Sequence, residues 1–309
     1  MAEKTGTRSA LRRLGYAAEA VGAFLAYGVF AALPVDAASG LGGWIGRSFG
    51  PRLPLSQRAV AHITAAFPDK PRAEIDRIVR LMWDMLGRIA GEYPHLDAIT
   101  RDAGKPGSRI AVEGRETVEL LRRGGAALLF SGHIANWELY APALAALGIP
   151  YAQVYRDPNN PFVSWLVRRV RRLPPDAMIP KGAAGARQSL ATLARGGRLG
   201  MLIDQKMNDG IAVPFFGRDA MTAPALARLA LRFGCPPVPV RLERLGGARF
   251  RLIFYPPLPI APSGDRDADT RALTARATRM IEDWIRERPE QWLWLHRRWP
   301  DPAATAAPP

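Results

Sequence analysis

Short apolar runs alternate with longer segments of helical periodicity from Ala126 onward, and this alternation constrains the fold more than any other feature of the sequence. Such alternation is typical of a mainly parallel sheet with helices packed against it. The expected strands are residues 126–130, 151–155, 200–203, 237–242 and 249–255. The expected helices are 138–147, 183–195, 223–233 and 270–287, each of the first three followed by a glycine that suits a helix C-terminus. The sequence therefore predicts an α/β sandwich.

Two connections refine this expectation. Residues 245–248 read Leu-Gly-Gly-Ala, which indicates a hairpin and hence an antiparallel pair at the end of the sheet. Residues 51–100 carry apolar side chains at three- and four-residue spacings, which predicts a helical lead-in. We expect three parts in the chain, namely an N-terminal segment 1–50, a main domain 51–300 with its α/β core at 101–300, and a disordered Ala/Pro-rich tail 301–309.

The stretch 14–33 is apolar except for Glu19, and its length of roughly 20 residues matches a helix that crosses a bilayer. Arginines flank it on both sides, so charge does not orient it. A membrane anchor or an interfacial helix is the favoured interpretation. A buried core helix and a signal peptide cleaved near residues 35–37 are the alternatives.

The net charge of +15 and the pI near 10.8 indicate an anionic partner. Nucleic acid, an anionic membrane, a phosphorylated lipid and an acidic carrier protein all fit. Cys235 is the only cysteine, so an intramolecular disulfide and a multi-cysteine metal site are excluded.

Reactive side chains follow three of the expected strands. The segment Ser131 to Glu138 follows the first, Arg156 follows the second, and Asp204 with Gln205 follows the third. Ligands of open α/β sheets bind beyond the carboxyl ends of the strands. We therefore expect these loops to bring a base, carboxylates and a guanidinium to one edge.

His133 and Glu138 form the candidate catalytic pair. On one continuous helix their spacing would place them about 140° apart, so we expect the helix to begin between them, with Asn136 as its N-cap. Glu138 then lies in the first turn, where a carboxylate facing His133 would fix the imidazole tautomer and raise its basicity. His133 is thus predicted to act as a general base.

No G-x-S-x-G elbow follows any of the expected strands, so direct attack by the hydroxyl of an acceptor is expected instead of a covalent acyl-enzyme. Arg156 is the candidate for stabilising the oxyanion. A metal site is not expected, because His133 is the one histidine of these loops and the scattered carboxylates around it lack metal-ligand spacing. The further candidates, for substrate binding, are Asn136, Asp204, Gln205, Lys181 and Arg218.

The block from Ser131 to Glu138 resembles the His-x4-acid motif of the bacterial lipid A late acyltransferases, the lauroyl and myristoyl transferases of the glycerolipid acyltransferase superfamily. Further blocks that resemble this family follow in its order, at 155–161, 203–206, 213–217 and 289–299. The resemblance implies acyl transfer from acyl carrier protein to a hydroxyl of a lipid A precursor, without a metal or cofactor, by a domain at 51–300. It also implies that His133 and Glu138 are catalytic, that Arg156, Asp204 and Gln205 act in the site, and that the protein lies at the cytoplasmic face of the inner membrane.

Two alternatives remain from the sequence. One is an acyltransferase of the same superfamily that uses acyl-CoA and another glycolipid or phospholipid. The other is a basic nucleic-acid-binding protein, suggested by the charge; no nucleic-acid motif supports it, and nucleic acid is not among the expected partners. The arginines at 168, 169, 171 and 172 form either a solvated basic face or a contact surface for an acidic carrier or anionic headgroups.

Overall fold

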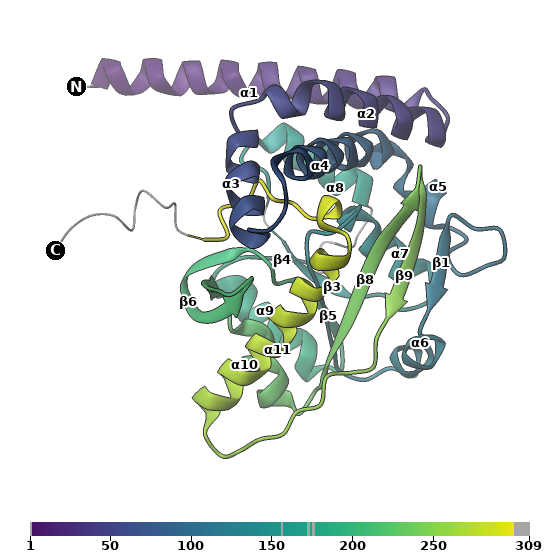
Figure 1. Cartoon of the computed structure of the whole chain (residues 1–309), viewed down its shortest axis with the longest axis vertical. Helices are drawn as coiled ribbons and strands as arrows, with labels where there is room; N and C mark the ends of the chain where they lie inside the picture. The colour runs from purple at the N-terminus through teal and green to yellow at the C-terminus, as the bar shows by residue number, and fades with distance from the viewer. Residues whose placement is uncertain (1, 156, 172–173, 175–176, 300–309) are drawn as a thin grey trace.

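A computed structural model describes residues 2–155, 157–171, 174 and 177–299, with side chains from residue 15 onward. Arg156 and the predicted disordered tail 301–309 lie outside the described residues. The elements follow one another from α1 near the N-terminus to the last helix, α11, and they surround one central sheet (Figure 1).

The central sheet has seven strands in the order β1-β9-β8-β2-β5-β3-β4. Neighbouring strands run parallel except for β8 and β9, which form the predicted hairpin. This confirms the mostly parallel α/β sheet. The bounds are β1 Ile110–Glu113, β2 Ala127–Ser131, β3 Ala152–Tyr155, β4 Met178–Pro180, β5 Arg198–Leu202, β8 Pro237–Gly246 and β9 Arg249–Phe254.

The five predicted strands correspond to β2, β3, β5, β8 and β9. The sequence did not predict β1 and β4, which have only four and three residues. It also missed a separate antiparallel hairpin of β6 (Lys206–Phe215) and β7 (Arg218–Thr222). The first half of β6 contains Asn, Asp and Gly, which are depleted in strands, so propensity gave no signal there.

Helices cover the sheet on both faces and across one end (Figure 1). The four predicted helices are present as α7 (Tyr140–Ala146), α9 (Ala183–Ala194), α10 (Ala225–Phe233) and α11 (Arg266–Glu287). Gly234 ends α10 in the left-handed conformation, with φ of 59°. The helices α6 (Arg115–Arg122) and α8 (Pro161–Arg171) were not predicted.

The N-terminal helices form a layer across one end of the molecule (Figure 1). They comprise α1 (Ala2–Ala31), α2 (Val35–Phe49), α3 (Ser56–Ala66), α4 (Arg72–Glu92) and the short α5 (Leu96–Thr100). The last three lie within residues 51–100, where the apolar spacings predicted helical structure. The stretch predicted as a membrane anchor lies mostly within α1. In the described part of the chain, no helix combines the length and the apolar character that a membrane span requires.

The helices α2 and α4 approach each other through glycines. A Cβ added at Gly42 would lie 2.2 Å from the carbonyl oxygen of Gly87, and one at Gly91 would lie 2.2 Å from that of Ala38. Only glycine allows the backbones this close. The close approach brings Ser39 of α2 beside Glu92, the last residue of α4, where the two side chains are joined by a 2.7 Å hydrogen bond.

The C-terminal segment belongs to the core. Trp292, Trp294 and Trp299 are all buried, and Trp292 and Trp294 pack edge to face with ring centroids 4.6 Å apart. The structure shows that they are core residues, and the segment that carries them lies against the loop that follows β2.

Candidate active site

His133 and Asp204 are brought together by the register of two parallel strands. Ser131 at the end of β2 pairs with Leu202 at the end of β5, and both functional residues lie two positions further along their chains. The imidazole Nδ1 of His133 is 2.8 Å from Oδ1 of Asp204. The convergence of loops at the carboxyl edge, predicted from the sequence, therefore occurs for β2 and β5.

Asp204 is a buried carboxylate with three donors. Its Oδ2 accepts hydrogen bonds from the backbone N–H of His133 at 2.8 Å and from the indole N–H of Trp292 at 2.7 Å. Burial opposes its ionisation, but the charge and hydrogen bonds of His133, together with the Trp292 donor, outweigh burial and hold the pKa of Asp204 below its ordinary value. An ionised Asp204 therefore accepts the proton of Nδ1, which leaves Nε2 as the basic nitrogen.

The Nε2 atom of His133 faces a cavity of about 420 Å³. The side-chain amide of Gln205 lies 3.2 Å from this nitrogen and donates to it. Nε2 therefore carries the basic lone pair of the ring, which accepts the Gln205 hydrogen bond here, and the tautomer is set from the opposite side of the ring by Asp204. This is the arrangement that a general base requires.

The cavity combines polar and apolar walls. Its charged and polar side chains include His133, Glu138, Arg171, Lys181, Gln205 and His296. Its apolar side chains include Leu129, Phe130, Leu144, Val154, Met201 and Val240. Walls of this composition suit a ligand that has both an apolar part and a polar or anionic part.

Glu138 does not occupy the position predicted for it. The carboxylate on Nδ1 of His133 comes from Asp204, whereas Glu138 binds Arg171 through two hydrogen bonds of 2.8 Å and accepts a third, of 3.1 Å, from the indole N–H of Trp137. The predicted direct pairing of His133 with Glu138 is therefore corrected. The physical reason is competition, because a guanidinium fork engages both carboxylate oxygens at once. Glu138 still lines the cavity, and a catalytic role for it stays a prediction.

The remaining predicted site residues divide into two groups. Lys181 and Gln205 line the cavity, as expected for substrate contacts. Asn136 is completely buried and caps the turn that begins at Trp137, as its predicted N-cap position required, so it is not placed to touch a substrate. Arg218 lies over the ring of Trp299, 5.2 Å from its centroid, outside the residues that form the cavity wall. Asp204, which was also predicted to bind substrate, contacts His133 instead of lining the cavity.

Two cavity residues were missed from the sequence. Arg171 is the last residue of α8, and its half-buried guanidinium lies beside Glu138 and Tyr155. The arginine cluster gave no signal that separated it from its exposed neighbour Arg168. His296 accepts a 3.0 Å hydrogen bond at Nε2 from the backbone N–H of Lys206, and burial lowers its pKa to about 4. His296 is therefore neutral at pH 7, and only the tertiary structure reveals its position.

Comparison with known proteins identifies relatives of the chain. The chain is 29% identical to the lipid A biosynthesis lauroyltransferase of Escherichia coli (strain K12) over 197 residues, which cover 61% of this chain and 60% of that protein. It is also 25% identical over 246 residues, covering 77% of this chain, to lipid A biosynthesis acyltransferase 1 of Shigella flexneri and to the lipid A biosynthesis myristoyltransferase of Escherichia coli (strain K12), with 73% of each protein covered. The match with the lauroyltransferase thus spans less than two thirds of that protein.

The sequence profile of one protein family, described as bacterial lipid A biosynthesis acyltransferase, matches residues 5–301. This range is nearly the whole chain, and it contains all of the blocks that resembled the family in the sequence. The chain belongs to the bacterial lipid A biosynthesis acyltransferase family.

Proposed function

We propose that the protein transfers a fatty acyl chain from a thioester to a hydroxyl of a lipid A precursor, with His133 as the general base. One observation carries this proposal. The imidazole of His133 is held by a buried carboxylate at Nδ1 and presents Nε2 to a cavity with apolar and cationic walls. Family membership supplies the reaction class that this geometry fits.

The proposed reaction proceeds in two steps. Nε2 of His133 takes the proton of the acceptor hydroxyl while the hydroxyl oxygen attacks the thioester carbonyl. This step forms a tetrahedral oxyanion and an imidazolium that Asp204 stabilises. The intermediate then collapses, the carbon–sulfur bond breaks, and the imidazolium gives its proton to the departing sulfur. The products are an ester and a thiol, and His133 returns to its starting state.

The oxyanion and any acceptor phosphate require positive charge at the cavity. Arg171 and Lys181 supply it from the wall. Glu138 fixes the Arg171 guanidinium with two hydrogen bonds, so its proposed catalytic contribution is to orient this cation beside the reacting groups. Arg156, predicted for the oxyanion, keeps that role as a prediction.

The donor and acceptor are proposed from the family and the walls of the cavity. Related proteins are named for lauroyl and myristoyl transfer in lipid A biosynthesis, and the apolar wall suits an acyl chain of that kind. We propose acyl carrier protein as the donor, since the protein is strongly basic and carriers of this class are acidic. The alternative is an acyl-CoA donor with another glycolipid or phospholipid as acceptor, and the mechanism is the same for both.

The lipid acceptor implies a membrane surface, and the N-terminal layer offers a face for it. Leu25 of α1 and Trp44 of α2 are 65% and 50% exposed, and Phe49 and Trp165 are also exposed. Trp165 of α8 packs against Phe24 of α1, with ring centroids 6.0 Å apart, so α1 and α8 join their exposed apolar side chains there. We propose that it lies on the cytoplasmic face of the inner membrane, where a cytosolic thioester reaches the site and the charge of +15 favours anionic lipid.

Transfer of a radiolabelled acyl chain tests donor and acceptor together. Detergent-solubilised protein is given a lipid A precursor with either acyl carrier protein thioester or acyl-CoA at equal concentration. We expect labelled lipid with the carrier-bound donor. Labelled product only with acyl-CoA and a different lipid would keep the chemistry and overturn the proposed substrates.

A further inference from the structure

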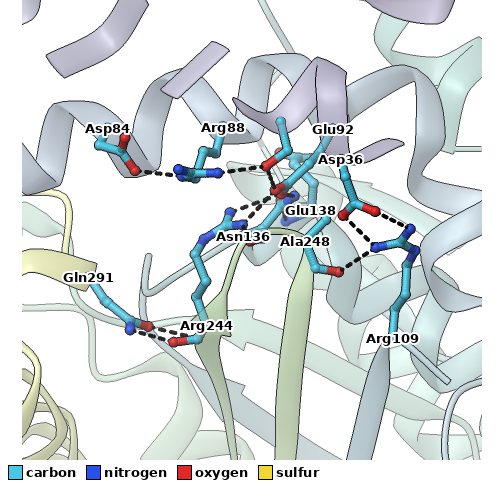
Figure 2. Close-up of polar contacts among 12 residues, drawn as sticks. Asp36, Asp84, Arg88, Glu92, Arg109, Asn136, Glu138, Arg244, Ala248 and Gln291 are labelled. Carbon is cyan, nitrogen blue, oxygen red and sulfur yellow. Dashed lines mark hydrogen bonds and ion pairs between the residues drawn. The ribbon is translucent and has the colours of Figure 1, made fainter. Parts of the chain in front are cut away.

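A buried carboxylate lies behind the motif loop, which we define as residues 133–138. Glu92 is the last residue of α4 and is 0% exposed. Its Oε1 accepts hydrogen bonds from Ser39 Oγ at 2.7 Å and from Arg244 at 2.5 Å. Its Oε2 accepts from Arg244 at 2.9 Å and from the side-chain amide of Asn136 at 2.8 Å. Figure 2 shows Glu92 at the centre of these contacts, which come from three separate parts of the fold.

Asn136 links Glu92 to the backbone of the motif loop through two hydrogen bonds. Its amide nitrogen donates to Glu92, while its Oδ1 accepts the backbone N–H of Glu138 at 3.2 Å. Asn136 is itself fully buried, so both contacts lie away from water. A hydrogen bond to an ionised acceptor is stronger and more directional than one between neutral groups. Glu92 therefore fixes the middle of the segment that runs from His133 to Glu138.

The preceding residue shows why this loop needs external support. Ala135 has a φ of 50°, a left-handed conformation that residues with a Cβ disfavour. Its backbone N–H donates to the carbonyl of Gln291 at 2.8 Å. The side chain of Gln291 in turn forms two 2.9 Å hydrogen bonds with the backbone of Arg244. Arg244 thus joins the support from the C-terminal segment to the support from Glu92.

We infer that Glu92 is a positioning residue for acyl transfer: through Asn136 it holds the motif loop so that His133 and Glu138 face the cavity. This inference rests on the proposed function. Arg244 balances the buried charge of Glu92, and Ser39 binds the same carboxylate from α2, on the side away from the loop. The two neighbours Ser39 and Asn136 therefore offer a matched pair of changes, each of which removes one hydrogen bond from Glu92.

Asn136→Ser and Ser39→Ala form the first test. Serine keeps a capping oxygen for the N–H of Glu138 but is too short to reach Glu92, whereas Ser39→Ala leaves the loop contacts intact. We expect Asn136→Ser to lower kcat by about 10- to 100-fold with KM changed by less than about three-fold, because small displacements of catalytic groups cost rate. Ser39→Ala is expected to keep kcat within about three-fold of wild type. Equal kcat in the two variants would overturn the inference.

A second variant removes the ion pair as a whole. Glu92→Leu with Arg244→Met eliminates both charges together, which proteins often tolerate, whereas removing one partner would strand the other. We expect a fall in kcat like that of Asn136→Ser. Adding Asn136→Ser to this pair is expected to cause no further fall, since the contact is already lost. A further fall would show that Asn136 acts without Glu92 and would contradict the inference.

A measurement without substrate separates this inference from the proposed function. The chain has four histidines, so ¹⁵N-histidine labelling gives few ring signals, and those missing from His133→Ala belong to His133. We expect Asn136→Ser to shift the His133 ring signals and Ser39→Ala to leave them unchanged. Unchanged signals in Asn136→Ser would overturn the positioning role, even if the wild type transfers acyl chains. Absence of transfer by the wild type would overturn the proposed function alone.

Discussion

His133 and Asp204 occupy equivalent places on neighbouring parallel strands, each two residues beyond one member of the pair Ser131 and Leu202. Their side chains meet at 2.8 Å because the strands end together. This relationship makes Asp204 the partner of the imidazole and leaves Glu138 to Arg171. The carboxylate partner of the candidate base therefore comes from the neighbouring strand and not from the loop of the base itself.

Asp204→Asn tests this partnership. The amide cannot accept hydrogen bonds from all three donors, which are the backbone N–H of His133, its Nδ1 and the Trp292 indole N–H. Nδ1 therefore loses its anionic acceptor, and the basic tautomer is no longer fixed. We expect kcat to fall by about 10²- to 10⁴-fold, with KM changed little. Initial rates measure the effect, and circular dichroism checks the fold. A folded variant with more than half of the wild-type kcat would refute the role of Asp204.

Glu138→Ala tests the orientation of Arg171. Loss of the bidentate carboxylate frees the guanidinium, and we expect kcat to fall by about 10- to 100-fold, while Glu138→Asp retains more activity. Combining Glu138→Ala with Arg171→Ala is expected to add little, because the two act as a unit. Arg168→Ala is the control on the same helix, since Arg168 lies outside the cavity wall and forms an exposed ion pair with Asp157. Additive losses in the double variant would argue against a shared role.

The buried position of His296 predicts a pH effect on stability. Burial lowers its pKa to about 4 from an ordinary value of 6.5, so between these values the unfolded chain binds a proton that the folded chain does not. The free energy of unfolding therefore falls as pH is lowered through this window. We expect His296→Gln, which can still accept from the Lys206 N–H, to show a smaller drop in Tm between pH 7 and about pH 4.5 than wild type. Equal drops would contradict the assignment.

The apolar face of the N-terminal layer predicts membrane binding. Serine substitutions at Leu25, Trp44 and Phe49 remove exposed apolar side chains and are expected to weaken sedimentation with anionic phospholipid vesicles by about ten-fold or more. Leu120→Ser is the matched control, because Leu120 is 49% exposed on α6, away from that layer (Figure 1). Equal vesicle binding by the triple variant and the control would contradict the proposal that this face binds the membrane.

Periodicity and glycine positions predicted most of the fold. The strands β2, β3, β5, β8 and β9 are apolar runs long enough to be seen in the sequence, whereas β4 has only three residues and depends on its neighbour β3. The hairpin of β6 and β7 lacks a propensity signal in its first half. Such elements form because the tertiary structure offers them a partner.

The sequence predicted which residues form the site better than it predicted the contacts among them. His133, Glu138, Gln205 and Lys181 line the cavity, and Asp204 lies at the predicted edge. The partner of His133 could not be chosen from the sequence, because Glu138 is near in sequence while Asp204 is near only through the register of two strands. Glu92 gave no signal at all, since its contact with Asn136 joins residues 44 positions apart.

Acyl transfer by His133→Ala tests the central claim most directly. The variant and the wild type are compared for transfer of labelled acyl chain from acyl carrier protein to a lipid A precursor, with circular dichroism to confirm equal folding. Because the variant lacks the base but keeps the cavity walls, we expect its kcat to fall by at least about 10²-fold. A folded His133→Ala protein that transfers acyl chains at near the wild-type rate would contradict the account.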